Sequence, residues 1–343
     1  MKFVIVFFAI IGAVLACNQN ADCVSCTTNS GCFYDNAASS CKSVLLQLFT
    51  SQSSVIPLPY DCPTNPPGNF QYSDDFGRNR ALVFAMASNG LTPDDAQICL
   101  TNRVPDAKIV KQYTVVCDWF QSNCSAILAL NPKENSIVVA FRGTKGATQF
   151  FIEAINLLVY QSSSSPLFDG KVFTYFANAF DLLWTSGLAS DLQNLKNENP
   201  SYELWTFGHS LGGSLATLAA NAAVKTGIFT GDKVKVVTMG EPRTGDYTFA
   251  QGVSKNVPGI YRIVHGADLV TKLPLKLTLE QKSAYHTNFE VWYNNDMAQG
   301  AGFVVNNRAD DQSGSNTVNY DGKDYHNNYF NVDNDNYHLN GCL

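Results

Sequence analysis

The segment Gly-His-Ser-Leu-Gly-Gly at residues 208–213 has the residue types and spacing of a serine nucleophile. A strand-like stretch, residues 202–207, precedes it, and small and apolar residues, 211–224, follow it. Gly-x-Ser-x-Gly between a strand and a helix forms a nucleophile elbow, in which the serine occupies a strained turn. The partial positive charge of the helix N-terminus favours a developing oxyanion. The pattern therefore predicts Ser210 as the nucleophile of an acyl-transfer reaction.

A serine nucleophile needs a base, and the chain has five histidines. His209 is held within the turn itself, and His265 precedes the best acid, whereas the expected chain order is serine, acid, histidine. His286 stands directly before a strand-like segment, which would hold it at an edge of the sheet. His326 and His338 lie in an Asn- and Asp-rich tail, where a solvated histidine is the ordinary outcome. We therefore expect His286 to be the base.

The remaining groups follow from the ends of strands. Asp268 comes just after an expected strand, the loop position of the acid that orients the histidine. Asp246 is the alternative acid, and it could instead be the N-cap of a helix. The backbone N–H of Leu211 is one expected oxyanion donor. Thr144, which follows a buried strand and Gly143, is the other, through its N–H and hydroxyl.

The elements around these residues alternate between strands and helices, which predicts an α/β fold. We expect a mostly parallel central sheet flanked by helices. The expected strands are residues 111–117, 126–130, 137–141, 202–207, 234–239, 261–264 and 289–292, and helical patterns cover 81–87, 172–183 and 211–224.

The chain resembles the class 3 lipase family, which includes secreted fungal triacylglycerol lipases. The resemblance covers roughly residues 75–293 and implies the α/β-hydrolase fold, with Ser210, Asp268 and His286 as the triad and Thr144 and Leu211 as the oxyanion hole. It implies no metal and no cofactor. Its motifs are Phe-Arg-Gly-Thr at 141–144, Gly-His-Ser-Leu-Gly-Gly at 208–213, Gly-Glu-Pro-Arg-Thr-Gly-Asp at 240–246, Asp-Leu-Val at 268–270, and His286 followed by Glu-Val-Trp at 290–292. Residues 172–176, Val-Phe-Thr-Tyr-Phe, depart from the family's Val-His-x-Gly-Phe.

The resemblance also directs attention to the apolar stretch 148–160, the position at which the family carries a lid. Two interpretations stay open for it: a mobile flap that meets a lipid–water interface, or an ordinary core helix.

The first sixteen residues have the pattern of a signal peptide, since Lys2 precedes an apolar run that ends in Val-Leu-Ala. This run is shorter than the ~20 residues that span a bilayer, and no second one follows, so we expect no transmembrane segment. The ten cysteines suit full pairing in an oxidising compartment. We expect secretion or residence in a lysosome-like lumen; bacterial lipidation at Cys17 is the alternative.

Six cysteines lie within residues 17–62, which predicts a small disulfide module. The Cys23-x2-Cys26 spacing could also indicate zinc, but no second CxxC or His pair follows at the spacing of a zinc site, so disulfides are the expected role. A Pro-rich linker, 63–68, leads to the catalytic domain, 69–293, and an Asn- and Asp-rich extension, 294–343. The remaining cysteines are expected to pair as Cys117–Cys124 and Cys99–Cys342.

A formal net charge of −6, with no basic cluster, argues against a nucleic-acid partner. The sequence thus predicts a secreted serine ester hydrolase that acts on acylglycerols, with a lipid or ester substrate at a lipid–water interface. A phospholipase or a feruloyl-type esterase is the alternative, followed by a catalytically silent lipid-binding protein. Oligomeric state is not predicted.

Overall fold

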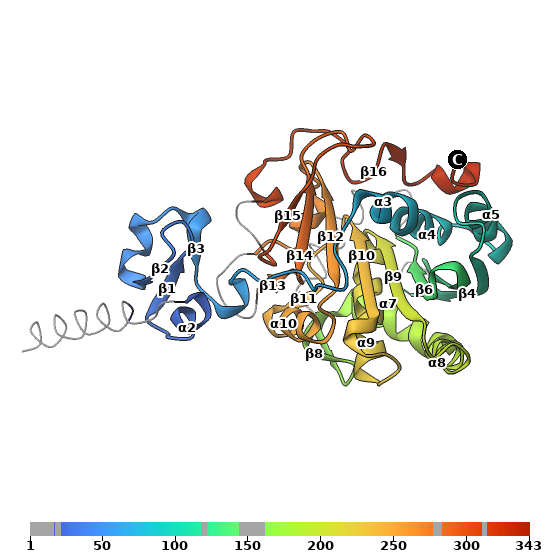
Figure 1. Ribbon diagram of the computed structural model, residues 1–343, viewed down its shortest axis with the longest axis horizontal. Coiled ribbons are helices and arrows are strands. Elements are labelled where there is room, and N and C mark those ends of the chain that lie inside the picture. Colours follow the sequence, from blue (N-terminus) through green and yellow to red (C-terminus); the bar gives the residue numbers. More distant parts are fainter. Residues whose placement is uncertain (1–16, 18–21, 118–121, 144–161, 277–282, 311–313) are drawn as a thin grey trace, which may run out of the picture.

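The computed structural model describes residue 17 and residues 22–117, 122–143, 162–276, 283–310 and 314–343. Its centre is an eight-stranded sheet in the order β15-β14-β12-β10-β9-β6-β5-β4, in which β6, β9, β10, β12 and β14 run parallel (Figure 1). Strands β5 and β15 pair antiparallel with their neighbours. The predicted α/β fold with a mostly parallel sheet is confirmed.

The strands of this sheet are β4 (Lys108–Val116), β5 (Asn123–Asn131), β6 (Ser136–Phe141), β9 (Glu203–His209), β10 (Val234–Met239), β12 (Ile260–His265), β14 (Phe289–Tyr293) and β15 (Val304–Asn306). A smaller sheet has the order β13 (Ala284–Tyr285), β11 (Gly245–Asp246), β8 (Phe168–Phe173) and β7 (Ser162–Ser165). The tail adds a hairpin of β16 (Asn328–Tyr329) and β17 (Val332–Asp333).

The main helices are α3 (Asp74–Phe76), α4 (Leu82–Ala87), α5 (Pro93–Arg103), α7 (Thr174–Leu183), α8 (Ala189–Glu198), α9 (Leu211–Lys225) and α10 (Tyr247–Asn256). They cover both faces of the sheet, which explains why every residue of β6 and of β12 is buried. Along β6, Val139 packs with α7 and α9, whereas Val138 and Ala140 pack on the other face with α4 and α5. The sheet therefore has one hydrophobic core on each face.

The N-terminal module is stapled as its cysteine count predicts. Helix α2 (Cys23–Thr27) packs beside a small sheet of β1 (Cys32–Asp35), β2 (Ser40–Ser43) and β3 (Val55–Ile56). The disulfides are Cys17–Cys32, Cys23–Cys62 and Cys26–Cys41. In Figure 1 the module is a separate lobe beside the main body.

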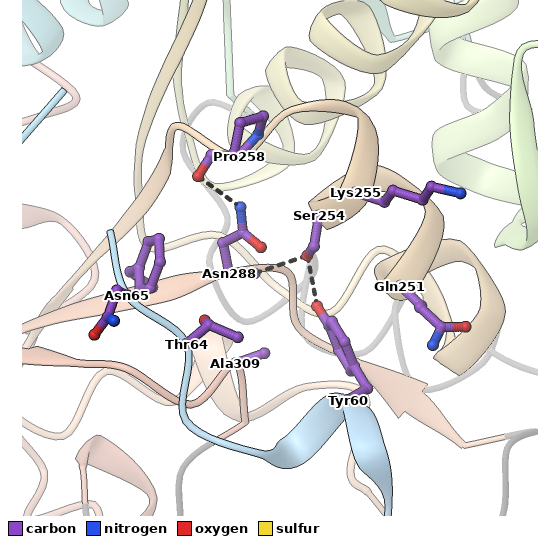
Figure 2. A pocket seen from close by; sticks show the side chains of 10 residues that line it. Tyr60, Thr64, Asn65, Gln251, Ser254, Lys255, Pro258, Asn288 and Ala309 are labelled. Atoms are coloured by element: carbon purple, nitrogen blue, oxygen red, sulfur yellow. Dashed lines mark hydrogen bonds between the residues drawn. The ribbon is translucent and has the colours of Figure 1, made fainter. Parts of the chain in front are cut away.

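The module is nevertheless joined to the main body by buried and partly buried hydrogen bonds. The hydroxyl of Tyr60 donates to the backbone carbonyl of His286 at 2.9 Å. It accepts from the hydroxyl of Ser254 at 2.7 Å (Figure 2). The guanidinium of Arg308 donates to the carbonyls of Asp61 and Ser53, both at 3.2 Å. These bonds hold the segment after β3 against α10 and the tail.

The C-terminal tail differs from the expected polar extension after residue 293. Strand β15 joins the central sheet, and Tyr329, Phe330 and Tyr337 are buried in the core next to α4 and α5. The expected disulfide Cys99–Cys342 ties the tail to α5, and the expected Cys117–Cys124 bridge is also present. The described residues of the tail, 294–310 and 314–343, thus pack as part of the main body. Buried aromatic side chains supply the apolar surface that this tail, poor in aliphatic residues, would otherwise lack.

Two expected segments, the signal peptide at 1–16 and the apolar stretch 148–160, lie outside the described residues. Among the residues that the structure does describe, every helix is too short or too polar to cross a bilayer.

Candidate active site

Ser210 occupies a sharp turn between β9 and α9, as the elbow pattern predicts. Its backbone has φ 56° and ψ −127°, in the left-handed half of the conformational map, where a side chain is strained. A Cβ on Gly208 would lie 2.0 Å from the carbonyl oxygen of Gly212, and one on Gly212 would lie 2.2 Å from that of Phe141. Only glycine fits two residues before and two residues after the serine, so the turn is specified by this five-residue spacing.

Asp268 lies fully buried in the loop after β12. Its carboxylate accepts from Nδ1 of His326 at 2.9 and 3.1 Å, from the hydroxyl of Tyr329 at 2.7 Å, and from the backbone N–H of Val270 at 2.9 Å. Burial raises the pKa of Asp268, but the charge and hydrogen bond of His326, with the bonds from Tyr329 and Val270, outweigh it and hold that pKa below its ordinary value. The carboxylate is therefore ionised at neutral pH.

The histidine at this carboxylate is His326, and the prediction that His286 pairs with Asp268 is wrong. His286 is buried elsewhere, where its Nε2 donates to the backbone carbonyl of Thr271 at 2.7 Å. Burial, together with the positive charges of Arg262 and Arg243, lowers the pKa of His286 well below its ordinary value. The negative charge of Asp310 only partly offsets this lowering, and the hydrogen bond given for the His286 ring goes to a backbone carbonyl, whereas a triad base bonds to a carboxylate.

His326 lies against the serine turn. Its backbone carbonyl accepts from Nε2 of His209 at 2.7 Å, and the two imidazole rings pack with centroids 4.6 Å apart. A Cβ on Gly240 would lie 2.9 Å from the His326 ring, and the residue before it, Met239, accepts the backbone N–H of Ser210 at 2.9 Å. Because Nδ1 of His326 is taken by the carboxylate, Nε2 is the nitrogen left for the serine hydroxyl.

His209 supports the base without being one. Burial and, to a lesser degree, the neighbouring His326 lower its pKa to about 3, so the ring is neutral and Nε2–H can donate to the carbonyl of His326. This bond links the residue before the nucleophile directly to the backbone of the candidate base.

The end of β6 also reaches the elbow. A Cβ on Gly143 would lie 2.7 Å from the carbonyl oxygen of His209 and 3.5 Å from Cβ of Ser210. Thr144, the next residue, lies outside the described residues, so its role as an oxyanion donor stays a prediction. Leu211, the other predicted donor, is the first residue of α9.

Asp246, the alternative acid, has its other predicted role. Its side chain caps α10 by accepting from the backbone N–H of Phe249 at 2.8 Å, and it also accepts from the N–H of Lys171 at 3.1 Å. The structure therefore gives Asp246 a local structural function.

A second buried carboxylate, Glu241, braces the turn after β10. It accepts hydroxyl hydrogen bonds from Thr217 at 3.0 Å, from Thr238 at 2.7 Å and from Thr244 at 3.3 Å. Burial raises the pKa of Glu241 to about 7, against these bonds and the charge of Arg262. Because Thr217 lies on α9, the carboxylate connects the helix that follows Ser210 to the 241–244 turn.

Comparison with known proteins identifies the family of the chain. A profile of the family described as Lipase (class 3) matches residues 138–278. A lipase of Caenorhabditis elegans is 30% identical over 261 residues, which cover 70% of this chain and 71% of that relative. The chain belongs to the class 3 lipase family. As a member of the family it is a carboxylic ester hydrolase.

Two further comparisons place this class 3 lipase among fungal relatives. Secreted mono- and diacylglycerol lipase 1 of Fusarium solani is 30% identical over 154 residues, 45% of this chain and 44% of that relative. The solved structure of lipase II from Rhizopus niveus superposes with a TM-score of 0.64 at 22% identity, over 78% of this chain and 96% of that one. The latter shows a shared fold.

The sequence reasoning missed His326 and Tyr329 because both lie in the tail. One signal could have found them: aromatic residues flank His326 at positions 325, 329 and 330, which is unusual for a solvated segment. His326 also satisfies the chain order of serine, acid and histidine as well as His286 does.

Proposed function

We propose that this class 3 lipase is a secreted hydrolase of acylglycerols in which Ser210 is the nucleophile, His326 the base and Asp268 the acid. The observation that carries the proposal is the buried bond between Asp268 and Nδ1 of His326, made beside a strained serine elbow. His326 replaces His286 in the triad that the sequence predicts.

The reaction follows from these positions. Nε2 of His326 takes the hydroxyl proton as the oxygen of Ser210 attacks the ester carbonyl, and Asp268 stabilises the resulting imidazolium. The backbone N–H of Leu211, with Thr144 as its predicted partner, holds the oxyanion. The tetrahedral intermediate collapses, the alcohol leaves with the proton of His326, and an acyl-enzyme remains. Water, deprotonated by His326, then attacks the acyl-enzyme and releases the fatty acid.

Acylglycerols are the substrate class best supported by the relatives, which are named lipases and a mono- and diacylglycerol lipase. Secretion is supported by the five disulfides, which form and persist in oxidising compartments, and by the leader-like residues 1–16. The Fusarium solani relative is itself named as secreted.

A three-substrate panel tests the proposal. We expect the purified chain to hydrolyse triolein faster than phosphatidylcholine or a feruloyl ester, and a fluorophosphonate probe to label Ser210. The matched control is Ser210→Ala, which should fold and lose both activity and labelling. A preference for phosphatidylcholine or the feruloyl ester would reassign the substrate, and unchanged turnover by Ser210→Ala would refute the nucleophile.

A further inference from the structure

The disulfide module displays an unusual apolar surface. The short helix Val44–Phe49 follows β2 with the sequence Val-Leu-Leu-Gln-Leu-Phe, and none of its residues is buried. Leu48 is 89% exposed and Phe49 86% exposed, and Val44, Leu45 and Leu46 are exposed as well. Elsewhere in the described part of the chain, no two exposed large apolar residues are adjacent in sequence. We call the five apolar side chains of this helix the apolar turn.

Folding of the module does not account for this exposure. The module buries five of its six cysteines together with Phe33, Val55 and Ile56, and the apolar turn adds no buried side chain. The turn is nevertheless held in place, because the Ser43 side chain accepts from the N–H of Leu45 and the Cys26–Cys41 disulfide lies just before it. Five apolar side chains are thus presented to solvent from a stapled support, which marks an interaction surface.

The charge pattern identifies what the turn contacts. Residues 43–60 contain no Asp, Glu, Lys, Arg or His, and Lys42, directly before them, pairs with Asp35 at 2.6 Å, so the turn and the chain after it carry no charge that would steer them to a charged surface. A six-residue helix is also far smaller than the roughly 20–30 residues that each side of a stable protein interface supplies. Insertion of apolar side chains into lipid requires no shape-matched partner. An uncharged lipid surface therefore fits the turn better than a protein or a second copy.

We propose that the apolar turn of the disulfide module docks the enzyme on the surface of neutral acylglycerol lipid; this inference rests on the proposed function. The contacts of Tyr60 and Arg308 connect the docked module to the catalytic body. Because Tyr60 bonds to both α10 and the backbone of His286, the module holds that body at the oil surface. The turn acts in adsorption, and the chemistry stays with Ser210 and His326.

Flotation with a triolein emulsion tests the proposal, using the full chain with Ser210→Ala so that the lipid is not consumed. We expect Leu48→Ser/Phe49→Ser to lower the partition coefficient by about tenfold to a hundredfold, the range for removing two partly inserted large apolar side chains. Leu45→Ser/Leu46→Ser should act in the same direction. The matched control, Leu91→Ser/Leu343→Ser, removes two isolated exposed leucines, and we expect its partition coefficient to stay within about twofold of the parent.

The same substitutions in the active enzyme should leave turnover of dissolved p-nitrophenyl butyrate unchanged, which shows that the chain is folded, while lowering triolein hydrolysis. Equal flotation of both apolar-turn variants and the control would overturn the inference. So would loss of flotation of the Ser210→Ala parent at high salt, which would indicate a charged contact, or a dimer of that parent that Leu48→Ser/Phe49→Ser dissociates. If the Ser210→Ala parent floats but the wild type does not hydrolyse triolein, the proposed function fails separately from the docking surface.

Discussion

The choice between two buried histidines gives the sharpest test of the active site. In His326→Ala, the proton acceptor is lost and Asp268 loses its partner at 2.9 Å. We expect kcat on p-nitrophenyl butyrate to fall about ten-thousand-fold, or about 5.5 kcal/mol of transition-state stabilisation, as when a triad member is removed. KM should change little, because the substituted group acts on the serine proton.

His286→Ala is the matched control, since both side chains are buried and each makes one defined hydrogen-bonding contact. It leaves the carbonyl of Thr271 without its 2.7 Å donor and opens a cavity, so it should cost about 2–4 kcal/mol of unfolding free energy. Turnover per folded molecule should stay within about tenfold of wild type. Kinetics with a soluble ester, combined with urea unfolding, separates the two effects. The opposite pattern, with activity lost in folded His286→Ala and kept in His326→Ala, would refute the assignment.

Three further changes probe the groups around this pair. Tyr329→Phe removes the 2.7 Å bond to Asp268, so we expect the pKa of that carboxyl to rise and kcat to fall about tenfold; an unchanged acidic limb of the pH–rate profile would contradict this. Glu241→Gln should remove a pH dependence of the unfolding free energy. Burial raises the folded-state pKa of Glu241 to about 7, so the folded state holds a proton on this carboxyl that the unfolded state has already released. This proton stabilises the fold at low pH, and the contribution, about 3 kcal/mol of unfolding free energy, is lost as pH rises through 7. Urea unfolding at pH 5 and pH 8 should show a smaller decline in Glu241→Gln than in wild type, and parallel declines would rule the explanation out. The double variant Cys99→Ser/Cys342→Ser frees the tail that carries His326 and should lower the unfolding free energy by about 3–5 kcal/mol; Cys117→Ser/Cys124→Ser, which opens a loop with a sequence separation of only 7, is the control and should cost less.

The serine elbow could be predicted from the sequence because its determinants are local. Gly208 and Gly212 are required by contacts that they make with each other and with the end of β6. The strand before Ser210 and the helix after it are both continuous buried runs. The position of Asp268 could also be predicted from local sequence, because it lies in the loop directly after a buried strand, three residues after His265, where β12 ends.

The base could not be predicted in this way because its burial is a long-range property. His326 lies in a segment with few aliphatic residues, and its environment comes from Asp268, His209 and Gly240, all of which are more than 50 residues away in the chain. The composition of such a segment predicts exposure to solvent. In the structure, its aromatic side chains and the disulfide between Cys99 and Cys342 hold it against the hydrophobic core.

The position of His286 explains why a well-placed histidine is not the base. Its side chain holds the carbonyl of Thr271, and its own carbonyl accepts the hydroxyl of Tyr60 from the disulfide module. Burial and the charges of Arg262 and Arg243 outweigh the charge of Asp310 and lower the pKa of His286, so the site disfavours the imidazolium that general-base catalysis creates. The loop before β14 therefore serves as the attachment point of the module, while the tail supplies the catalytic imidazole. This division lets the module stay attached without restricting the histidine that must face the substrate.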